Sequence, residues 1–372
     1  MKVTVIGGGN IGMCLAGEIS RLSRYDVTIY TSHPKDFERN IKITDDERNI
    51  TFLSGEITAT NNIEVALKDT DIVLCTLPAF LRKTFIQRAE PFVNNTAYFG
   101  FLPGYGGAEF YCGDLIKKGV TIFALQKVPY VARTKVRGKI AGLMSKKTKV
   151  YVAAIPKQKT KAVSELIEDM LLIETVCLNN YMEATLLPGN PLLHTSGSYV
   201  YLKDYKDGQG FDNQIYYYQS WTDECSKVIC AFSDEMMEIC RRLPVPLDGV
   251  QSIQEYYESP TPELLTKKFH TIPSFYPLTL PMKVKEGRYY PDFDSRFYTE
   301  DIPNGVCIIK ALAIIAKVNT PTIDCILAWY NKMTGKEYFN ADDSFGKDIN
   351  ETAIPQLFGI DTPEALKEFY LK

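Results

Sequence analysis

The first twelve residues constrain the fold of this 372-residue chain more than any other stretch. Residues 3–6 are apolar or β-branched, which is typical of a buried strand. Gly7, Gly9 and Gly12 follow with the spacing G-x-G-x-x-G. In this spacing the first glycine makes a tight turn, the second lets the backbone approach a pyrophosphate, and the third lets helix and strand pack closely. Apolar residues then recur at helical spacing, so this stretch predicts a dinucleotide-binding domain.

The end of the second expected strand, Asp26–Tyr30, is the place that selects the cofactor. An NAD enzyme usually carries Asp or Glu there, about 20 residues after the glycines. This chain has no acid there and instead has small hydroxyls with two nearby cations, so we expect NADP(H) rather than NAD(H). A solvated loop with two surface cations also fits. The cofactor contacts expected from these segments and from the loop after strand 71–77 are Gly7, Gly9, Asn10, Ile11, Gly12, Thr31, Ser32, Lys35, Arg39, Leu77 and Pro78.

Strand and helix patterns alternate through the first half of the chain. This alternation predicts an α/β fold with a Rossmann-type, doubly wound parallel sheet. We expect strand 150–155 to pair with part of 128–143. The expected strands are 26–30, 50–60, 71–77, 96–101, 120–124 and 150–155, with helices at 79–89, 108–118 and 159–172.

From about Tyr181 the pattern becomes helical, and no strand–helix alternation is visible. We therefore expect two domains, a dinucleotide-binding domain over 1–180 and an all-helical domain over 181–372. The active site is expected where the two domains meet, beyond the carboxyl ends of the strands. Segment 199–219 matches no motif, and we expect a surface loop there rather than a pocket lining. The expected helices are 214–242, 247–258, 262–270, 302–317 and 321–334.

The composition excludes several classes of protein. Forty-two Lys and Arg against 45 Asp and Glu give a net charge of −3, whereas general nucleic-acid and membrane-surface binders carry a basic surplus. Nine scattered cysteines without a C-x-x-C pair favour buried free thiols over disulfides or a metal site. The first strand begins at Lys2 and no apolar run reaches the length of a membrane span. We therefore expect a cytoplasmic protein without a metal, and the oligomeric state stays open, with a homodimer as one candidate.

Two segments in the second half carry residues suited to acid–base chemistry and anion binding. His194 lies in a Pro- and Gly-rich stretch at the start of the helical half; both a catalytic and a structural role are open. Asp301 precedes an apolar helix, where a plain N-cap also fits. Arg296 is suited to bidentate binding of a substrate carboxylate, with a surface ion pair as the alternative. The other two histidines fit a cofactor loop (His33) and a helix end (His270).

Five motifs in this order resemble the octopine/nopaline (opine) dehydrogenase family over nearly the whole chain. They are the glycine loop and the segments at 76–80 (TLPAF), 128–133 (VPYVAR), 190–195 (NPLLHT) and 299–305 (TEDIPNG). The resemblance implies a Rossmann domain followed by a helical domain similar to the C-terminal domain of 6-phosphogluconate dehydrogenase. It also implies a reaction in which an L-amino acid condenses with a 2-oxo acid such as pyruvate, and NAD(P)H reduces the resulting imine.

The resemblance assigns roles to individual residues. His194 matches the family's catalytic proton donor, and Asp301 matches the carboxylate that orients it. Arg296 matches an arginine thought to hold a substrate carboxylate, and the family-like segments add Arg133 and Asn190 as candidate substrate contacts. An imidazole titrates near neutrality, and a carboxylate partner favours its protonated form.

Two other functions remain open on the sequence alone. One is a related reductase of 2-oxo or 3-hydroxy acids, similar to ketopantoate reductase, which acts on a carbonyl without an amine. The other is a nucleotide-binding sensor without turnover, which has no need for a general acid such as His194. The sequence does not name the amino acid, the 2-oxo acid or the physiological direction.

Overall fold

The computed structural model describes residues 1–187 and 189–371. It divides into two compact units, which are treated separately below. Unit 1 comprises Met1–Thr185 together with the C-terminal segment that begins at Lys367, and unit 2 comprises Leu186–Leu366.

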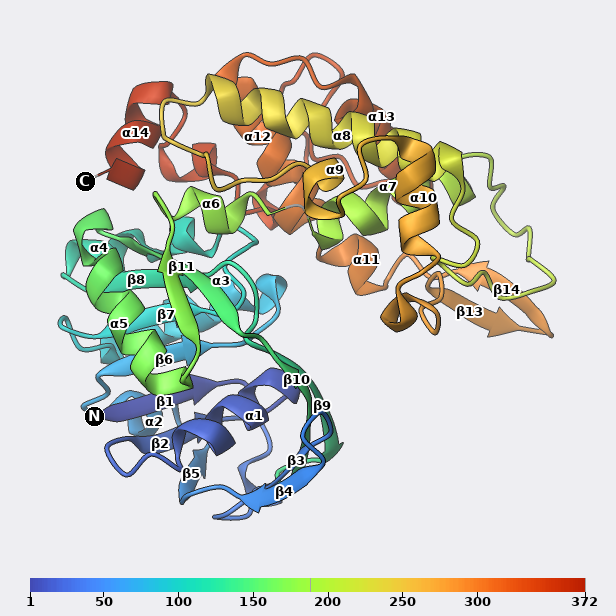
Figure 1. Ribbon diagram of the computed structural model, residues 1–372. Coiled ribbons are helices and arrows are strands. Elements are labelled where there is room, and N and C mark those ends of the chain that lie inside the picture. The colour runs from blue at the N-terminus through green and yellow to red at the C-terminus, as the bar shows by residue number, and fades with distance from the viewer. Residues whose placement is uncertain (188, 372) are drawn as a thin grey trace. The chain divides into compact units, whose positions relative to one another are not determined.

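Unit 1 is built on one eight-stranded sheet with the order β12-β11-β8-β7-β6-β1-β2-β5 (Figure 1). The six strands from β8 to β5 in this order are parallel, whereas β11 is antiparallel to β8 and β12 is parallel to β11. This sheet confirms the predicted doubly wound fold, and the strand order reverses between β1 and β6. The strands are β1 (Lys2–Ile6), β2 (Asp26–Tyr30), β5 (Ile57–Thr60), β6 (Ile72–Cys75), β7 (Tyr98–Phe101), β8 (Thr121–Leu125), β11 (Lys149–Ile155) and β12 (Glu174–Cys177).

The strands at the centre of this sheet are apolar because helices and loops cover both faces. All residues of β6 and β8, and all of β1 except Lys2, are buried. Such continuous apolar runs are typical of parallel strands. The helices of unit 1 are α1 (Asn10–Ile19), α2 (Ile63–Leu67), α3 (Ala79–Ala89), α4 (Gly113–Lys117), α5 (Thr160–Leu171) and α6 (Met182–Thr185), joined by the end of α14 (Pro363–Leu371).

A second, four-stranded sheet with the order β4-β3-β10-β9 packs on α1. The predicted pairing of strand 150–155 with part of 128–143 is wrong, because residues 130–146 form β9 and β10, which pair with each other and with β3. Tyr130, Ala132, Ala141 and Leu143 of these two strands are buried in the core that includes α1. The strands are β3 (Lys42–Asp45), β4 (Ile50–Leu53), β9 (Tyr130–Val136) and β10 (Ile140–Lys146).

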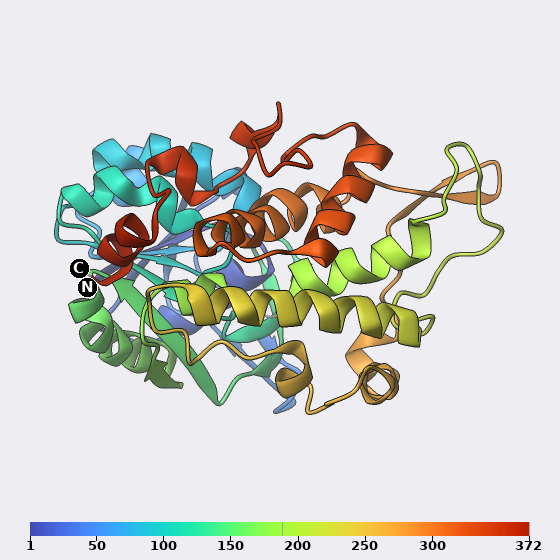
Figure 2. The same cartoon turned by 90° about the horizontal axis from the view of Figure 1, so that it is seen from above.

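The described residues of unit 2 form helices and one two-stranded hairpin, which the sequence patterns missed. The 20-residue helix α8 packs against α7, α10, α12 and α13 and is drawn in yellow in Figure 2. The hairpin and the loop before α8 lie side by side in both views and are joined by a bridge between Phe211 and Tyr289. The elements are α7 (Asn190–Leu202), α8 (Asp223–Arg242), α9 (Ile253–Tyr256), α10 (Pro262–Phe269), β13 (Met282–Lys285), β14 (Arg288–Pro291), α11 (Arg296–Thr299), α12 (Cys307–Ala316) and α13 (Pro321–Thr334).

Three predicted helix boundaries in unit 2 differ from the structure. Helix α8 begins at Asp223 rather than at Gln214, because the Thr222 side chain accepts a hydrogen bond from the Cys225 amide and caps the helix there. The helix expected over 247–258 is only the single turn of α9. The helix expected from residue 302 opens with a π-helical turn, Ile302–Val306, before α12.

A buried carboxylate in unit 1 joins the two ends of that unit's chain. Glu109 Oε1 accepts hydrogen bonds from Thr185 Oγ1 at 2.5 Å and from Tyr370 Oη at 2.9 Å. Thr185 is the last residue before unit 2, and Tyr370 lies just after the chain returns from it. The second oxygen, Oε2, has no hydrogen-bond partner among the described residues. Burial raises the pKa of Glu109 from 4.5 to about 7, against the opposing hydrogen bonds and the nearby Arg82 charge.

This raised pKa predicts a pH-dependent stability. Between pH 4.5 and 7 the folded protein keeps a proton on Glu109 that the unfolded chain releases, so the unfolding free energy should fall as the pH rises and level off above pH 7. The shift corresponds to about 3 kcal/mol. Glu109→Gln keeps the accepting oxygen but cannot ionise, so chemical denaturation should show the variant gaining stability over the wild type as the pH rises from 5 to 7.5. A constant difference between the two proteins would contradict this prediction.

Candidate functional site

The glycine turn of unit 1 lies where the strand order reverses. Gly7 follows β1 with φ +107°, and the loop after the neighbouring strand β6 lies directly against it. Thr76 Oγ1 donates a hydrogen bond to the Ile6 carbonyl at 2.9 Å, and Leu77 and Pro78 follow in the same loop. Ligands of doubly wound sheets bind at this reversal, at the carboxyl ends of the strands.

The turn has the shape that a dinucleotide requires. A Cβ at Gly12 would lie 1.8 Å from the Gly7 carbonyl oxygen, so only glycine lets α1 start this close to the turn. A Cβ at Gly9 would meet no protein atom within 4 Å, and Gly9 is the N-cap of α1. The open space at Gly9 and the helix N-terminus behind it fit a pyrophosphate, whose charge the amide groups of the first turn would stabilise.

Other predicted contacts near this turn have structural partners of their own. Asn10 Oδ1 accepts a hydrogen bond from the Thr134 amide of β9 at 2.8 Å. Ile11 is partly buried and packs on the core. Arg133 is exposed on β9, whereas its neighbour Ala132 is buried in the core that includes α1. Arg133 belongs to unit 1, whereas the other two predicted substrate contacts, Arg296 and Asn190, belong to unit 2.

The segment after β2 carries the two cations expected near the cofactor. Thr31 is buried, and a Cβ on Gly8 would lie 2.7 Å from its Oγ1. Ser32 is exposed and hydrogen-bonds His33 Nδ1 at 2.8 Å. Lys35 is exposed in a short 3₁₀ turn, and Arg39 pairs with Glu56 at 2.8 Å with both side chains mostly in solvent.

In unit 2 the structure brings His194 and Asp301 together from positions 107 residues apart. His194 Nδ1 lies 2.7 Å from Asp301 Oδ2, with 13% and 5% of the two side chains exposed. Because a carboxylate only accepts hydrogen bonds, Nδ1 carries the hydrogen in this pair. Nε2 is therefore the nitrogen that can exchange a proton with a ligand.

Two aromatic residues hold the imidazole and its helix. The Phe297 ring stacks on the His194 ring with centroids 3.6 Å apart and an interplanar angle of 5°. The buried Tyr217 donates hydrogen bonds through its hydroxyl to the carbonyls of His194 and Leu193, at 2.6 and 3.0 Å. The expectation of a surface loop over 199–219 is therefore wrong at both ends, since residues 199–202 belong to α7, and Tyr217 and Tyr218 are core residues.

Asp301 does not act as a plain N-cap. It precedes the π-helical turn, but its side chain makes no capping hydrogen bond and instead faces His194. Burial raises the pKa of Asp301, and the hydrogen bond and charge of His194 oppose that rise. A buried carboxylate with one basic partner fixes the ring orientation of that partner.

Arg296 lies five residues before Asp301, and its guanidinium is held by the carboxylate of Glu300. Its Nε lies 2.5 Å from Glu300 Oε2, and its Nη2 contacts the same oxygen. The Glu300 carboxylate is buried, whereas 62% of the Arg296 side chain is exposed. Glu300 was missed in the sequence, although it stands beside Asp301 in the quoted motif. Asn190 begins α7 and is exposed one turn before His194.

Within residues 1–187 and 189–371, a second centre could involve His270 or a group of metal-ligating side chains. His270 ends α10, as predicted, and its Nε2 hydrogen-bonds the Trp221 carbonyl. The described residues contain no group of three or more His, Cys, Asp or Glu side chains suited to a metal ion. None of the helices they form has the length and apolar character of a membrane span.

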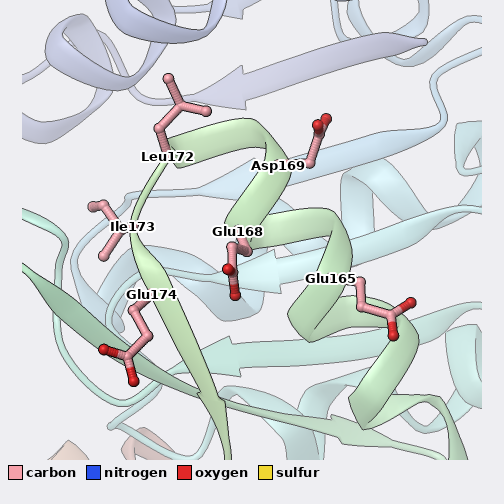
Figure 3. A pocket seen from close by; sticks show the side chains of 6 residues that line it. All are labelled: Glu165, Glu168, Asp169, Leu172, Ile173 and Glu174. Atoms are coloured by element: carbon pink, nitrogen blue, oxygen red, sulfur yellow. The ribbon is translucent and has the colours of Figure 1, made fainter.

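An open acidic hollow lies beside α5 (Figure 3). Its carboxylates already have partners, since Asp169 bonds Arg24 and Tyr25, Glu174 pairs with Lys149, and Glu168 accepts from the Thr175 amide. The hollow therefore has the character of a solvated surface. Its lining residues are Glu165, Glu168, Asp169, Leu172, Ile173 and Glu174.

Two family models match different parts of the chain. Residues 177–334 match the model for the NAD/NADP octopine/nopaline dehydrogenase alpha-helical domain, and residues 2–100 match the model for the NAD-dependent glycerol-3-phosphate dehydrogenase N-terminus. Among solved structures, octopine dehydrogenase with NADH and L-arginine, and with NADH and pyruvate, superposes with a TM-score of 0.85 at 24% identity over 98% of this chain and 97% of that one. Yersinopine dehydrogenase with NADP⁺ gives a TM-score of 0.70 at 12% identity, over 96% of this chain and 99% of that one.

A curated relative extends the similarity over the full length. The opine dehydrogenase of Haliotis discus hannai is 30% identical, and the alignment covers 98% of both chains. The chain therefore belongs to the octopine/nopaline (opine) dehydrogenase family, whose members are NAD(P)-dependent oxidoreductases.

Proposed function

We propose that this protein is an NAD(P)H-dependent opine dehydrogenase that reductively joins an L-amino acid to a 2-oxo acid such as pyruvate, and catalyses the reverse oxidation. The observation that carries the proposal is the buried His194–Asp301 pair, because a proton donor with an orienting carboxylate is what imine formation and reduction require. A nucleotide sensor has no need for such a pair.

The two units would supply different halves of the reaction. The glycine turn, the start of α1 and the loop Thr76–Pro78 would hold NAD(P)H, which supplies a hydride when bound. His194 would donate a proton through Nε2 to the substrate oxygen, so that the amino nitrogen displaces water from the 2-oxo acid and an imine forms. Hydride addition at the imine carbon and protonation of its nitrogen then give a secondary amine with two carboxylates.

Arg296 is proposed to hold one of those carboxylates. Its guanidinium is mostly exposed, yet the buried Glu300 fixes its direction, which suits a residue that waits for an anionic ligand. Arg133 and Asn190 stay candidate substrate contacts. Octopine dehydrogenase has been solved with L-arginine and with pyruvate, so these two compounds are the first to try here.

The decisive test is oxidation of NADPH and NADH, followed by nicotinamide absorbance, with pyruvate plus a pool of L-amino acids, against pyruvate alone and amino acids alone. We expect oxidation that needs both substrates, and dividing the pool then identifies the amino acid. Equal oxidation with pyruvate alone would overturn the proposal in favour of a simple 2-oxo acid reductase. No oxidation of NADPH or NADH with any pairing of 2-oxo acid and amine would favour a nucleotide-binding protein without turnover.

The cofactor preference is a separate proposal, in favour of NADPH. β2 ends without an acid, and the exposed Lys35 and Arg39 follow it. The Arg39–Glu56 pair is solvent-exposed and of the kind that contributes little, so a 2′-phosphate can replace Glu56. Lys35→Ala with Arg39→Ala should raise the Kd for NADPH about 10–100-fold, and that for NADH less than about twofold.

The matched control replaces two exposed lysines on other helices, Lys117→Ala with Lys161→Ala, and should leave both cofactors unchanged. Fluorescence titration of NADPH and NADH measures all four constants. Equal weakening of the two cofactors by the Lys35 and Arg39 changes would rule out contact with the 2′-phosphate.

A further inference from the structure

One buried arginine in unit 1 has no role in the site described so far. Arg82 lies on α3 with only 1% of its surface exposed. Its guanidinium donates three hydrogen bonds to backbone carbonyls: Nε to Leu77 at 3.0 Å, Nη2 to Pro103 at 3.0 Å and Nη1 to Tyr105 at 2.6 Å. All three carbonyls belong to loops rather than to helices or strands.

These loops leave the carboxyl ends of two adjacent strands. Leu77 follows β6, whereas Pro103 and Tyr105 follow β7, and the two strands are parallel with Cys75 opposite Phe101. The loop after β6 also lies against the glycine turn, as described above. The loop after β7 is joined to β8 by the hydrogen bond from the Gly104 amide to the Leu125 carbonyl. One guanidinium therefore links the loop after β6 to the loop after β7. Both loops lie at the carboxyl ends of the strands, where ligands of such sheets bind.

The chemistry of the Arg82 side chain indicates that it fixes the positions of these loops and does not only stabilise the fold. Burying a guanidinium carries a desolvation cost that an apolar side chain of similar volume would avoid. The planar guanidinium fork of arginine spreads its donors over three nitrogens, which here reach three separate carbonyls, whereas the three donors of lysine share one nitrogen. The buried Glu109 lies near enough for the Arg82 charge to lower its pKa, but burial holds that pKa at about 7, so Glu109 becomes an opposite charge for Arg82 only as the pH rises past this value.

We propose that Arg82 is a positioning residue of the dehydrogenase site, which fixes the loops after β6 and β7 that would line the nicotinamide and 2-oxo acid half of that site. The inference rests on the proposed function for its effect on turnover. Its effect on the loops and on cofactor binding stands independently of which substrates the enzyme uses.

The test compares Arg82→Lys, which keeps the charge but loses the fork, with Arg88→Lys, an exposed arginine on the same helix. A second variant, Arg82→Met with Glu109→Gln, removes both buried ionisable groups together. Each purified protein is assayed for Tm, for NAD(P)H Kd by fluorescence, for kcat and both substrate KM values, and for hydrogen exchange of the Leu102 and Gly104 amides without ligand. These two amides are bonded to Cys75 and Leu125, so they report the loop after β7 directly.

We expect both Arg82 variants to fold, with faster exchange at Leu102 and Gly104, a cofactor Kd raised about tenfold, and a kcat lowered about 10–100-fold, because small misplacements of reacting groups have effects of this size. Arg88→Lys should match the wild type.

A lower Tm with Kd, kcat and KM within twofold of the control would overturn the proposal and leave Arg82 a structural residue. Recovery of both Arg82 variants only in unfolded form would also overturn it, since positioning requires that the unit folds without these bonds. If the wild type shows no amine-dependent turnover, the proposed function fails, whereas the Kd and exchange data still decide the role of Arg82.

Discussion

Replacing His194 with alanine is expected to lower kcat for amine-dependent NAD(P)H oxidation by about 10²–10⁴-fold, the range that general acid–base catalysis contributes. The reason is geometric: Asp301 occupies Nδ1, so Nε2 is the nitrogen left to deliver the proton, and alanine offers no replacement. The cofactor Kd should stay within about twofold, because the residues proposed to hold the cofactor all belong to unit 1. Steady-state kinetics together with fluorescence titration measures both quantities.

Two further variants separate proton donation from support of the fold. Asp301→Asn keeps the shape but presents an amide to Nδ1, so kcat should fall about 10²-fold while Tm changes little. His270→Gln changes a histidine whose Nε2 hydrogen-bonds the Trp221 carbonyl, and it should keep kcat within twofold. If His194→Ala retains wild-type kcat, the proton must come from another group or from water, and the proposed mechanism is wrong.

The N-terminal part of the fold could be predicted because its signals are local. The glycine spacing, the apolar run before it and the periodic helix after it all lie within residues 2–19, and the structure places β1 and α1 there. The strands β6, β7 and β8 were likewise visible as short apolar runs between turns. Their order in the sheet follows from the family of folds to which alternating strands and helices belong.

Long-range pairing was less accessible. Residues 130–146 look as strand-like as 150–155, and nothing in their periodicity indicates that they pair with β3 rather than with β11. The start of α8 illustrates a different limit, because apolar residues at 217, 218 and 221 continue the helical spacing upstream of the true start. The local signal that could have corrected this was Thr222 followed by two acids, the usual N-terminal pattern of a helix.

In the candidate site too, local motifs could be predicted, whereas contacts between distant residues could not. His194 and Asp301 were identified through motifs, but their contact depends on how residues 107 positions apart fold. Phe297 and Glu300 lie inside or beside the quoted motif, and only the structure shows that one stacks on the imidazole and the other holds Arg296. Arg82 and Tyr217 act on backbone carbonyls, and a residue that bonds a carbonyl leaves no trace in the pattern of side chains.

The glycine turn offers the second prediction with a large effect, in which two similar substitutions should behave differently. Gly12→Ala should lower the unfolding free energy of the ligand-free protein by about 2–3 kcal/mol, because its Cβ would lie 1.8 Å from a backbone oxygen that cannot move away alone. The strain displaces the turn itself, so the Kd for NAD(P)H should also rise about 10²-fold or more. Thermal unfolding without ligand and fluorescence titration measure the two effects.

Gly9→Ala should weaken NAD(P)H binding by a similar factor without this loss of stability. A Cβ at Gly9 meets no protein atom within 4 Å and φ is −91°, so the ligand-free protein should keep its Tm or gain slightly through a less flexible unfolded chain. The space that the methyl group fills is the space assigned to the pyrophosphate, and the clash therefore arises only when the cofactor binds. Wild-type cofactor affinity in Gly9→Ala would mean that the pyrophosphate does not approach this turn, and a stable, binding-competent Gly12→Ala would mean that α1 can shift away from the turn. Gly9→Ala is thus expected to lose cofactor binding but keep its stability, as a glycine that faces the ligand should. Gly12→Ala is expected to lose both, as a glycine that packs against the turn should.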